Sequence, residues 1–334
     1  MLASVSGAFM AWPWTASPAL AASRAGGDNG PVAWVANRAL VSDPGSTLTP
    51  VDLSDRQAES PVATASQPAA MAPWTDGRLL VVNEGKNTLS VLDTTSSTVS
   101  ATVEVGLQPD AVAVTHLSGG GGWLALVAIF GNDTVTPVHL GSLRAGSPIP
   151  VGAQPVAVAV APGSPGAPAT ALVADFAAGT VTPINLATMK PDPPIAVGTA
   201  PEAVAVQDGS SPTGPMALVA DFGSDQVTPI SVGSLAAMPA VSVGGNPTGI
   251  AVAPDGTAWV VAGDTLTPLP PGSPAGGAPL TLPGVGEAVA LQGGSRAWVA
   301  EQAGTIVPVR LPAGPAGKPV HVGGRPTALA LTPS

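Results

Sequence analysis

The chain has 334 residues and a formal net charge of −10, with only 11 Lys and Arg residues and no cysteine. Phosphate contacts need clustered Lys and Arg, so this composition argues against a nucleic-acid partner and against attraction to an anionic membrane surface. The lack of cysteine excludes disulfides, Cys–Zn sites and thiol catalysis. Gly and Pro make up about a quarter of the chain (41 and 39 residues), but 45% of it is hydrophobic. Because the apolar residues alternate, we predict many short strands separated by Gly/Pro turns.

Residues 1–27 differ from the rest of the chain. They are mostly small and apolar and contain Ala19-Leu20-Ala21, which resembles a signal-peptide cleavage site. We therefore predict a secretory signal peptide cut after Ala21 and an extracytoplasmic protein, secreted or on the cell surface. No Lys or Arg precedes Arg24, so the alternative is a disordered leader. No later run has the roughly 18 apolar residues that a membrane helix needs, so no membrane span is expected.

From Val32 onward the chain is a repeat, and residues 28–334 are predicted to form one domain. One strand that carries Thr or Ser before an aliphatic segment recurs at Thr49, Ser90, Thr136, Thr182, Thr228, Thr267 and Val307. A VG-xx-P-x-AVAV segment also occurs seven times. Repeats of about 40–46 residues with four short strands are typical of β-propellers, so we predict an all-β, seven-bladed propeller of four-stranded antiparallel blades.

The phase of the repeat predicts how the ring closes. If each AVAV strand is innermost in its blade, the last strand, Arg325–Pro333, has no downstream partners. It must then pair with the N-terminal strands within residues 32–65. This closure would remove the exposed sheet edges that invite aggregation.

The segment LLVVNEGKNTLSVLDTTSSTVSATVEVGLQPDAVAVT, residues 79–115, resembles the YVTN-repeat, YncE-like β-propellers. The resemblance extends over about residues 32–333. It implies a seven-bladed propeller that is usually exported. The chain departs from the family because it has no Tyr and because Thr-Pro replaces Ser-Val in five strands, at Pro50, Pro137, Pro183, Pro229 and Pro268. Since proline donates no hydrogen bond, we predict that the outermost strand beside it is short or bulged.

The residue after the proline that begins each inner strand is predicted to ring the mouth of the central channel. These seven positions are Ala69, Asp110, Val156, Glu202, Thr248, Glu287 and Thr327. Asp110, Glu202 and Glu287 bring three carboxylates together on alternate blades, and oxygen ligands suit Ca²⁺ or Mg²⁺. We therefore consider a metal site at these three residues. The alternative is a hydrated acidic surface with no bound ion.

Other polar and aromatic residues favour structural roles. The residue that ends each VADF-type strand is Asn37, Asn83, Ile129, Asp175, Asp221, Ala262 or Glu301, and we expect the Asn and Asp side chains to cap the following turn. Trp34, Trp259 and Trp298 share one register, which favours packing between blades. The three histidines, His116, His139 and His321, are expected at three different radii and so not in one site.

No catalytic or cofactor-binding residue is assigned. The repeat without a convergent catalytic set predicts a monomeric, non-catalytic binding or scaffold module with an unknown protein or small-molecule partner. The alternative is a divalent-cation-dependent hydrolase or lyase, lactonase-like, with its site at the acidic mouth.

Overall fold

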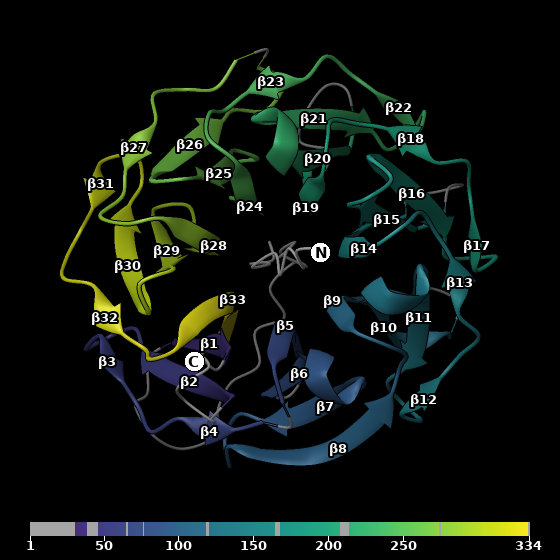
Figure 1. Ribbon diagram of the computed structural model, residues 1–334, viewed down its shortest axis with the longest axis horizontal. Helices are drawn as coiled ribbons and strands as arrows, with labels where there is room; N and C mark the ends of the chain where they lie inside the picture. Colours follow the sequence, from purple (N-terminus) through teal and green to yellow (C-terminus); the bar gives the residue numbers. More distant parts are fainter. Residues whose placement is uncertain are drawn as a thin grey trace, which may run out of the picture.

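The computed structural model describes residues 31–38, 46–64, 66–75, 77–117, 120–163, 168–207, 214–273 and 275–332. Seven antiparallel sheets lie around one axis as the blades of a propeller (Figure 1). Each blade is named below by its innermost strand. The predicted signal peptide, residues 1–27, lies outside the described residues.

The innermost strands are rich in Ala and Val, small residues that fit where the seven blades converge. They are β5 (Pro68–Trp74), β9 (Pro109–Leu117), β14 (Pro155–Ala161), β19 (Pro201–Gln207), β24 (Pro247–Val252), β28 (Gly286–Gln292) and β33 (Arg325–Thr332). The second strands are β1 (Val32–Arg38), β6 (Arg78–Asn83), β10 (Gly122–Ile129), β15 (Thr170–Asp175), β20 (Met216–Asp221), β25 (Ala258–Ala262) and β29 (Arg296–Glu301).

Outside the second strand, each blade has a third strand and rim segments, which are two residues long except for the seven-residue β8. The third strands are β2 (Thr47–Asp52), β7 (Thr88–Asp93), β11 (Thr134–His139), β16 (Thr180–Asn185), β21 (Gln226–Ser231), β26 (Thr265–Leu269) and β30 (Thr305–Arg310). The rim segments are β3 (Gln57–Ala58), β4 (Val62–Ala63), β8 (Thr98–Glu104), β12 (Arg144–Ala145), β13 (Ile149–Pro150), β17 (Lys190–Pro191), β18 (Ile195–Ala196), β22 (Ala236–Ala237), β23 (Val241–Ser242), β27 (Leu280–Thr281), β31 (Gly314–Pro315) and β32 (Val320–His321).

The ring closes as predicted. Strand β33, at the C-terminal end of the chain, pairs antiparallel with β1, from Val32 opposite Thr332 to Arg38 opposite Arg325. One blade, the β33 blade, is therefore built from strands of the N-terminal and C-terminal parts of the chain, and β1 and β33 lie side by side in Figure 1.

The prolines of the third strands determine the shape of the rim. In the β14 blade, Pro183 lies between the short pairings of β16 with β17 and with β18, and its carbonyl accepts the Asp192 N–H at 2.8 Å. The β5 blade has Val91 at this position, and its outer strand β8 continues over seven residues, with one bulge in its pairing between Val91 and Leu92. The predicted shortening of the outer strand beside proline is confirmed.

The core lies between neighbouring blades. Trp34, Trp259 and Trp298 are all buried in second strands, and Trp298 packs with Ala33, Val35 and Leu329 of the adjacent blade. The predicted packing role of these tryptophans is confirmed. Within the described residues the helices are three short 3₁₀ turns, none with the length or hydrophobicity to cross a membrane.

Candidate functional site

The seven predicted mouth positions share one backbone feature. Each is the second residue of an inner strand or, in β33, the third, and each falls where the register with the second strand shifts; in β19, for example, Pro201 pairs with Asp221 and Ala203 with Ala220. Such a bulge leaves its extra residue unpaired and re-aims its side chain. All seven residues are buried: Ala69, Asp110, Val156, Glu202, Thr248, Glu287 and Thr327.

The two threonines among them tie neighbouring blades together. The Thr327 hydroxyl donates to the Pro68 carbonyl of the next inner strand at 3.0 Å, and the Thr248 hydroxyl donates to the Gly286 carbonyl at 3.4 Å. An ionised carboxylate has no proton to donate in this way, so the acidic members of the set need other partners.

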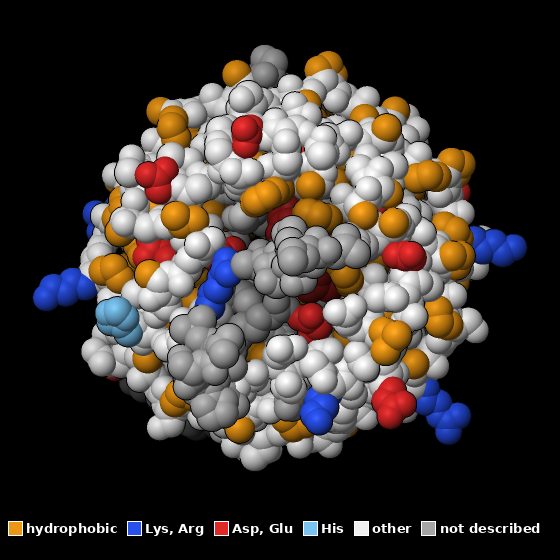
Figure 2. Space-filling view, in the orientation of Figure 1, with side chains coloured by type: hydrophobic (Ala, Val, Ile, Leu, Met, Phe, Trp, Pro, Cys, Tyr) orange, Lys and Arg blue, Asp and Glu red, His pale blue; other side chains and the backbone are white. Residues whose placement is uncertain are grey.

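Glu202 is the most constrained of the three carboxylates. The residue is 1% exposed, and its Oε2 atom has no hydrogen-bond partner among the described residues. Burial raises the pKa of Glu202 well above its usual range, and the charges of Asp110 and Glu287 raise it further. The three residues predicted from the repeat are therefore close enough to repel one another. Figure 2 shows acidic side chains around the middle of one face.

Glu287 has a cationic partner that the sequence analysis missed. Arg325, the first residue of β33, forms a salt bridge through its guanidinium nitrogen Nη2 to Glu287 Oε1. The Glu287 side chain is 6% exposed and that of Arg325 28%. Arg325 immediately precedes the proline of its inner strand, a register at which no other repeat has a basic residue, so aligning that column would have found it. Asp110, Glu202, Glu287 and Arg325 are called the axial cluster below.

Within the described parts of the chain, no three His, Asp or Glu side chains are arranged to coordinate one ion. The Ca²⁺ or Mg²⁺ site at Asp110, Glu202 and Glu287 stays a prediction.

A second set of polar side chains lies at the ends of the second strands. Asp221 Oδ2 accepts a hydrogen bond from the Thr228 hydroxyl at 2.5 Å and one from the Gly198 N–H. Asp175 Oδ2 accepts from the hydroxyls of Thr182 at 2.6 Å and Thr180 at 3.0 Å. Burial is the largest cause that raises the pKa of each aspartate to about 6.

The expectation that these side chains cap the following turn is wrong. At the 3₁₀ turns that follow Asn83 and Asp221, neither side chain makes a capping hydrogen bond. They reach instead to the third strand of their own blade, as Asn83 does to Ser90 at 3.0 Å. The repeated register of the blade places a Thr or Ser hydroxyl two residues beyond the position directly opposite, as with Ser90 for Asn83 and Thr228 for Asp221, and the buried amide or carboxyl bonds to it.

The histidines lie apart, as predicted. His116 is in an inner strand, where its ring meets the edge of Trp123 at a centroid distance of 5.1 Å. His139 ends a third strand and His321 lies in a rim segment, and both are exposed. They form no common site.

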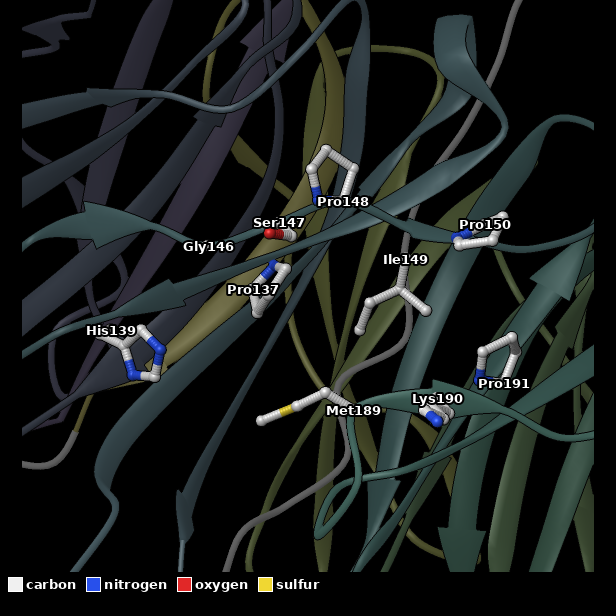
Figure 3. A pocket seen from close by; sticks show the side chains of 10 residues that line it. All are labelled: Pro137, His139, Gly146, Ser147, Pro148, Ile149, Pro150, Met189, Lys190 and Pro191. Atoms are coloured by element: carbon white, nitrogen blue, oxygen red, sulfur yellow. The ribbon is translucent and has the colours of Figure 1, made fainter.

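A separate hollow of about 420 Å³ lies on the outer rim between the β9 and β14 blades (Figure 3). Four prolines line it: Pro137, Pro148, Pro150 and Pro191. Its charged lining residue is Lys190, and Met189 adds to its apolar surface. The hollow follows from the split outer strands, because the prolines prevent the rim segments from closing over it.

No family model matches the sequence, and no curated protein matches it. The resemblance to the YVTN-repeat family therefore stays a prediction. Many solved structures are similar in fold.

A functionally unknown protein from Desulfotomaculum acetoxidans superposes with a TM-score of 0.73 at 15% identity, over 90% of this chain and 98% of that one. A "putative 6-phosphogluconolactonase" from Bacteroides fragilis has a TM-score of 0.71 at 14% identity, over 93% and 100%. Kuenenia stuttgartiensis hydrazine synthase has a TM-score of 0.65 at 17% identity, over 80% and 95%. At these identities the similarity shows the seven-bladed propeller fold alone.

Proposed function

We propose that this protein is an exported, non-catalytic binding module that takes its ligand at the axial cluster. The observation that carries the proposal is Glu202, a buried carboxylate with one oxygen that lacks a hydrogen-bond partner. An unsatisfied buried polar atom costs free energy, so its retention calls for a role that folding alone does not provide. A ligand that pairs with Glu202 would supply the missing partner.

The remaining features support binding rather than chemistry. The three carboxylates come from three different inner strands, and rigid strands hold a site more precisely than loops do. The net charge of −10 favours a cationic or neutral ligand and disfavours nucleic acid. We further propose that the module acts as a monomer, because the pairing of β33 with β1 closes the ring of blades within one chain. The signal-peptide pattern of residues 1–27 is the basis for proposing that it acts outside the cytoplasm.

Thermal unfolding tests this function. Wild type would be melted in metal-free buffer and again with CaCl₂, MgCl₂ or agmatine. We expect at least one of these cations to raise the Tm of wild type and to leave that of Glu202→Gln unchanged. Glu104→Gln, an exposed change on β8, is the matched control and should respond like wild type. If no cation raises the Tm, or if Glu202→Gln responds equally, the axial cluster is not the ligand site.

The second candidate is a divalent-cation-dependent hydrolase or lyase. Two similar structures carry the name "putative 6-phosphogluconolactonase", and carboxylate oxygens are the type of ligand that a divalent ion takes in proteins. Hydrolysis of glucono-δ-lactone, followed with a pH indicator in the presence of Mg²⁺ or Ca²⁺, separates the candidates. A binding module shows no rate above the buffer rate. Turnover that needs the cation and disappears in Glu202→Gln would favour the enzyme.

A further inference from the structure

We infer that the ligand of the axial cluster is an organic cation with a primary ammonium or guanidinium group, which pairs with Glu202. This inference rests on the proposed function and names the chemical class of the ligand. It depends on the partners of the three carboxylates, on their spacing around the axis, and on the groups that surround Glu202.

The chain itself already places one such cation in the cluster. The Arg325 guanidinium reaches from β33 to Glu287 on β28, two strands that are neighbours in the ring. A guanidinium therefore fits between these inner strands and pairs with a carboxylate that is almost fully buried. Arg325 is held at Glu287, and Oε2 of Glu202 has no hydrogen-bond partner within the described parts of the chain.

The spacing of the carboxylates suits an organic cation better than a single metal ion. Asp110, Glu202 and Glu287 lie on alternate inner strands, with Val156 and Thr248 on the strands between them. A metal ion must gather its oxygen ligands within about 2.0–2.6 Å. No three acidic or His side chains of the described residues are gathered in that way. An ammonium group needs only one carboxylate at hydrogen-bond distance.

The groups around Glu202 explain why a cation, and not a neutral ligand, is expected. The adjacent inner strands present Val156 and Thr248 at the same register, and neither ionises. The second strand β20 presents Asp221, which is engaged by Thr228 and Gly198. The charged groups that act on Glu202 are Asp110 and Glu287, both negative, with Arg325 held at Glu287. Among the residues that the structure describes, no positive group pairs with Glu202 itself.

The same surroundings couple ligand binding to a proton. Burial and two negative charges favour the protonated form of Glu202 in the free protein. A cation binds the ionised form, so binding must release this proton. While Glu202 is protonated in the free protein, the affinity for a cation should rise about tenfold for each pH unit.

Isothermal titration calorimetry with defined probes tests the inference. The probes are agmatine, butylamine, the neutral analogue 1-butanol, CaCl₂ and MgCl₂, each titrated into wild type, Glu202→Gln and the exposed control Glu104→Gln. We expect agmatine and butylamine to bind wild type and the control, with at least tenfold weaker binding to Glu202→Gln, and 1-butanol not to bind. The Kd of agmatine should fall as the pH is raised from 5.5 to 7.5. Arg325→Gln frees Glu287 and should tighten agmatine binding at least threefold.

Each contrary result has one meaning. If Ca²⁺ or Mg²⁺ binds in a Glu202-dependent way and the amines do not, the ligand class is wrong and the binding function stands. Amine binding that is equal in Glu202→Gln, or that does not change with pH, also overturns the inference. If no cation of either kind binds, both this inference and the proposed function fail.

Discussion

The β19 blade and the β33 blade hold the segment before an inner strand with hydrogen bonds of opposite direction. At the end of the second strand one has Asp221 and the other Asn37, and a Val-Gly peptide from the preceding segment lies against each side chain. Asp221 accepts a hydrogen bond from the N–H of this peptide, at Gly198. Asn37 donates to the carbonyl of the equivalent peptide, at Val322, at 3.0 Å. A carboxylate offers only acceptors and an amide nitrogen only donors, so the peptide presents the complementary group.

The glycines of the two peptides differ in backbone conformation and in the space around them. Gly323 has φ +77°, whereas Gly198 has no such left-handed φ. A Cβ at Gly198 would lie 2.6 Å from Cβ of Asp221, while one at Gly323 would meet nothing within 4 Å. One blade therefore needs glycine for space and the other for its backbone conformation.

The β28 blade supports the same rule with a third arrangement. The residue equivalent to Gly198 is Pro283, which has no N–H to donate. The acidic side chain there is the longer Glu301, which reaches the next N–H, that of Gly284, at 2.8 Å. The side chain at the end of the second strand thus determines how the segment before each inner strand is held.

The largest expected effect is a dependence of the free energy of unfolding on pH, which the blades with an aspartate at the end of the second strand contribute and the blades with an asparagine do not. Asp175 and Asp221 each have a folded pKa of about 6 against 3.8 for an unperturbed group. The folded state therefore binds more protons than the unfolded state between these values. Proton binding by these two groups therefore stabilises the folded state. The stabilisation is full below pH 3.8 and is lost as the pH rises through about 6, and it amounts to up to about 3 kcal/mol for each group.

Urea unfolding at pH 4, 5, 6 and 7 measures this loss. The variant Asp175→Asn/Asp221→Asn should have a smaller decrease of the free energy of unfolding over this range than wild type. Glu202 titrates in both proteins, so the difference between them isolates the two aspartates. Parallel curves would show that the aspartates do not titrate differently on folding.

Gly198→Ala should have the next largest effect. The added methyl group would overlap the Asp221 side chain, and overpacking of this kind costs about 1–3 kcal/mol. Gly323→Ala is the matched change at open space, where the left-handed φ alone costs about 1 kcal/mol. The free energies of unfolding should fall in that order. The double variant Gly198→Ala/Asp221→Ala should recover part of the lost free energy of unfolding, because it removes the side chain that the new methyl group overlaps. No such second substitution can help Gly323→Ala, because its cost comes from the backbone φ.

The smallest expected effect comes from Asn37→Asp, which gives the β33 blade an aspartate. At pH 7 the variant would lose the hydrogen bond from Asn37 Nδ2, and its carboxylate would face the Val322 carbonyl, which keeps only the Thr49 hydroxyl as donor at 2.9 Å, at a cost of about 1 kcal/mol. At pH 4 the protonated carboxyl can donate to that carbonyl, so most of the loss should vanish. Unfolding measured at both pH values checks this. An equal loss at both would mean that the peptide does not respond to the charge of the side chain.

The sequence by itself determined the seven blades, the closure of the ring by residues 325–332, and the common register of Asp110, Glu202 and Glu287. These features follow from short alternating strands and from prolines that repeat at one position, and both are local patterns. The tertiary structure alone decided that Glu202 is buried with an unpartnered oxygen and that Arg325 pairs with Glu287. It also decided which way the peptides before Gly198 and Gly323 face. These features depend on which side chains of neighbouring blades share a space from which water is excluded. Only the closed ring creates that space, since it brings together residues as distant as Asn37 and Val322.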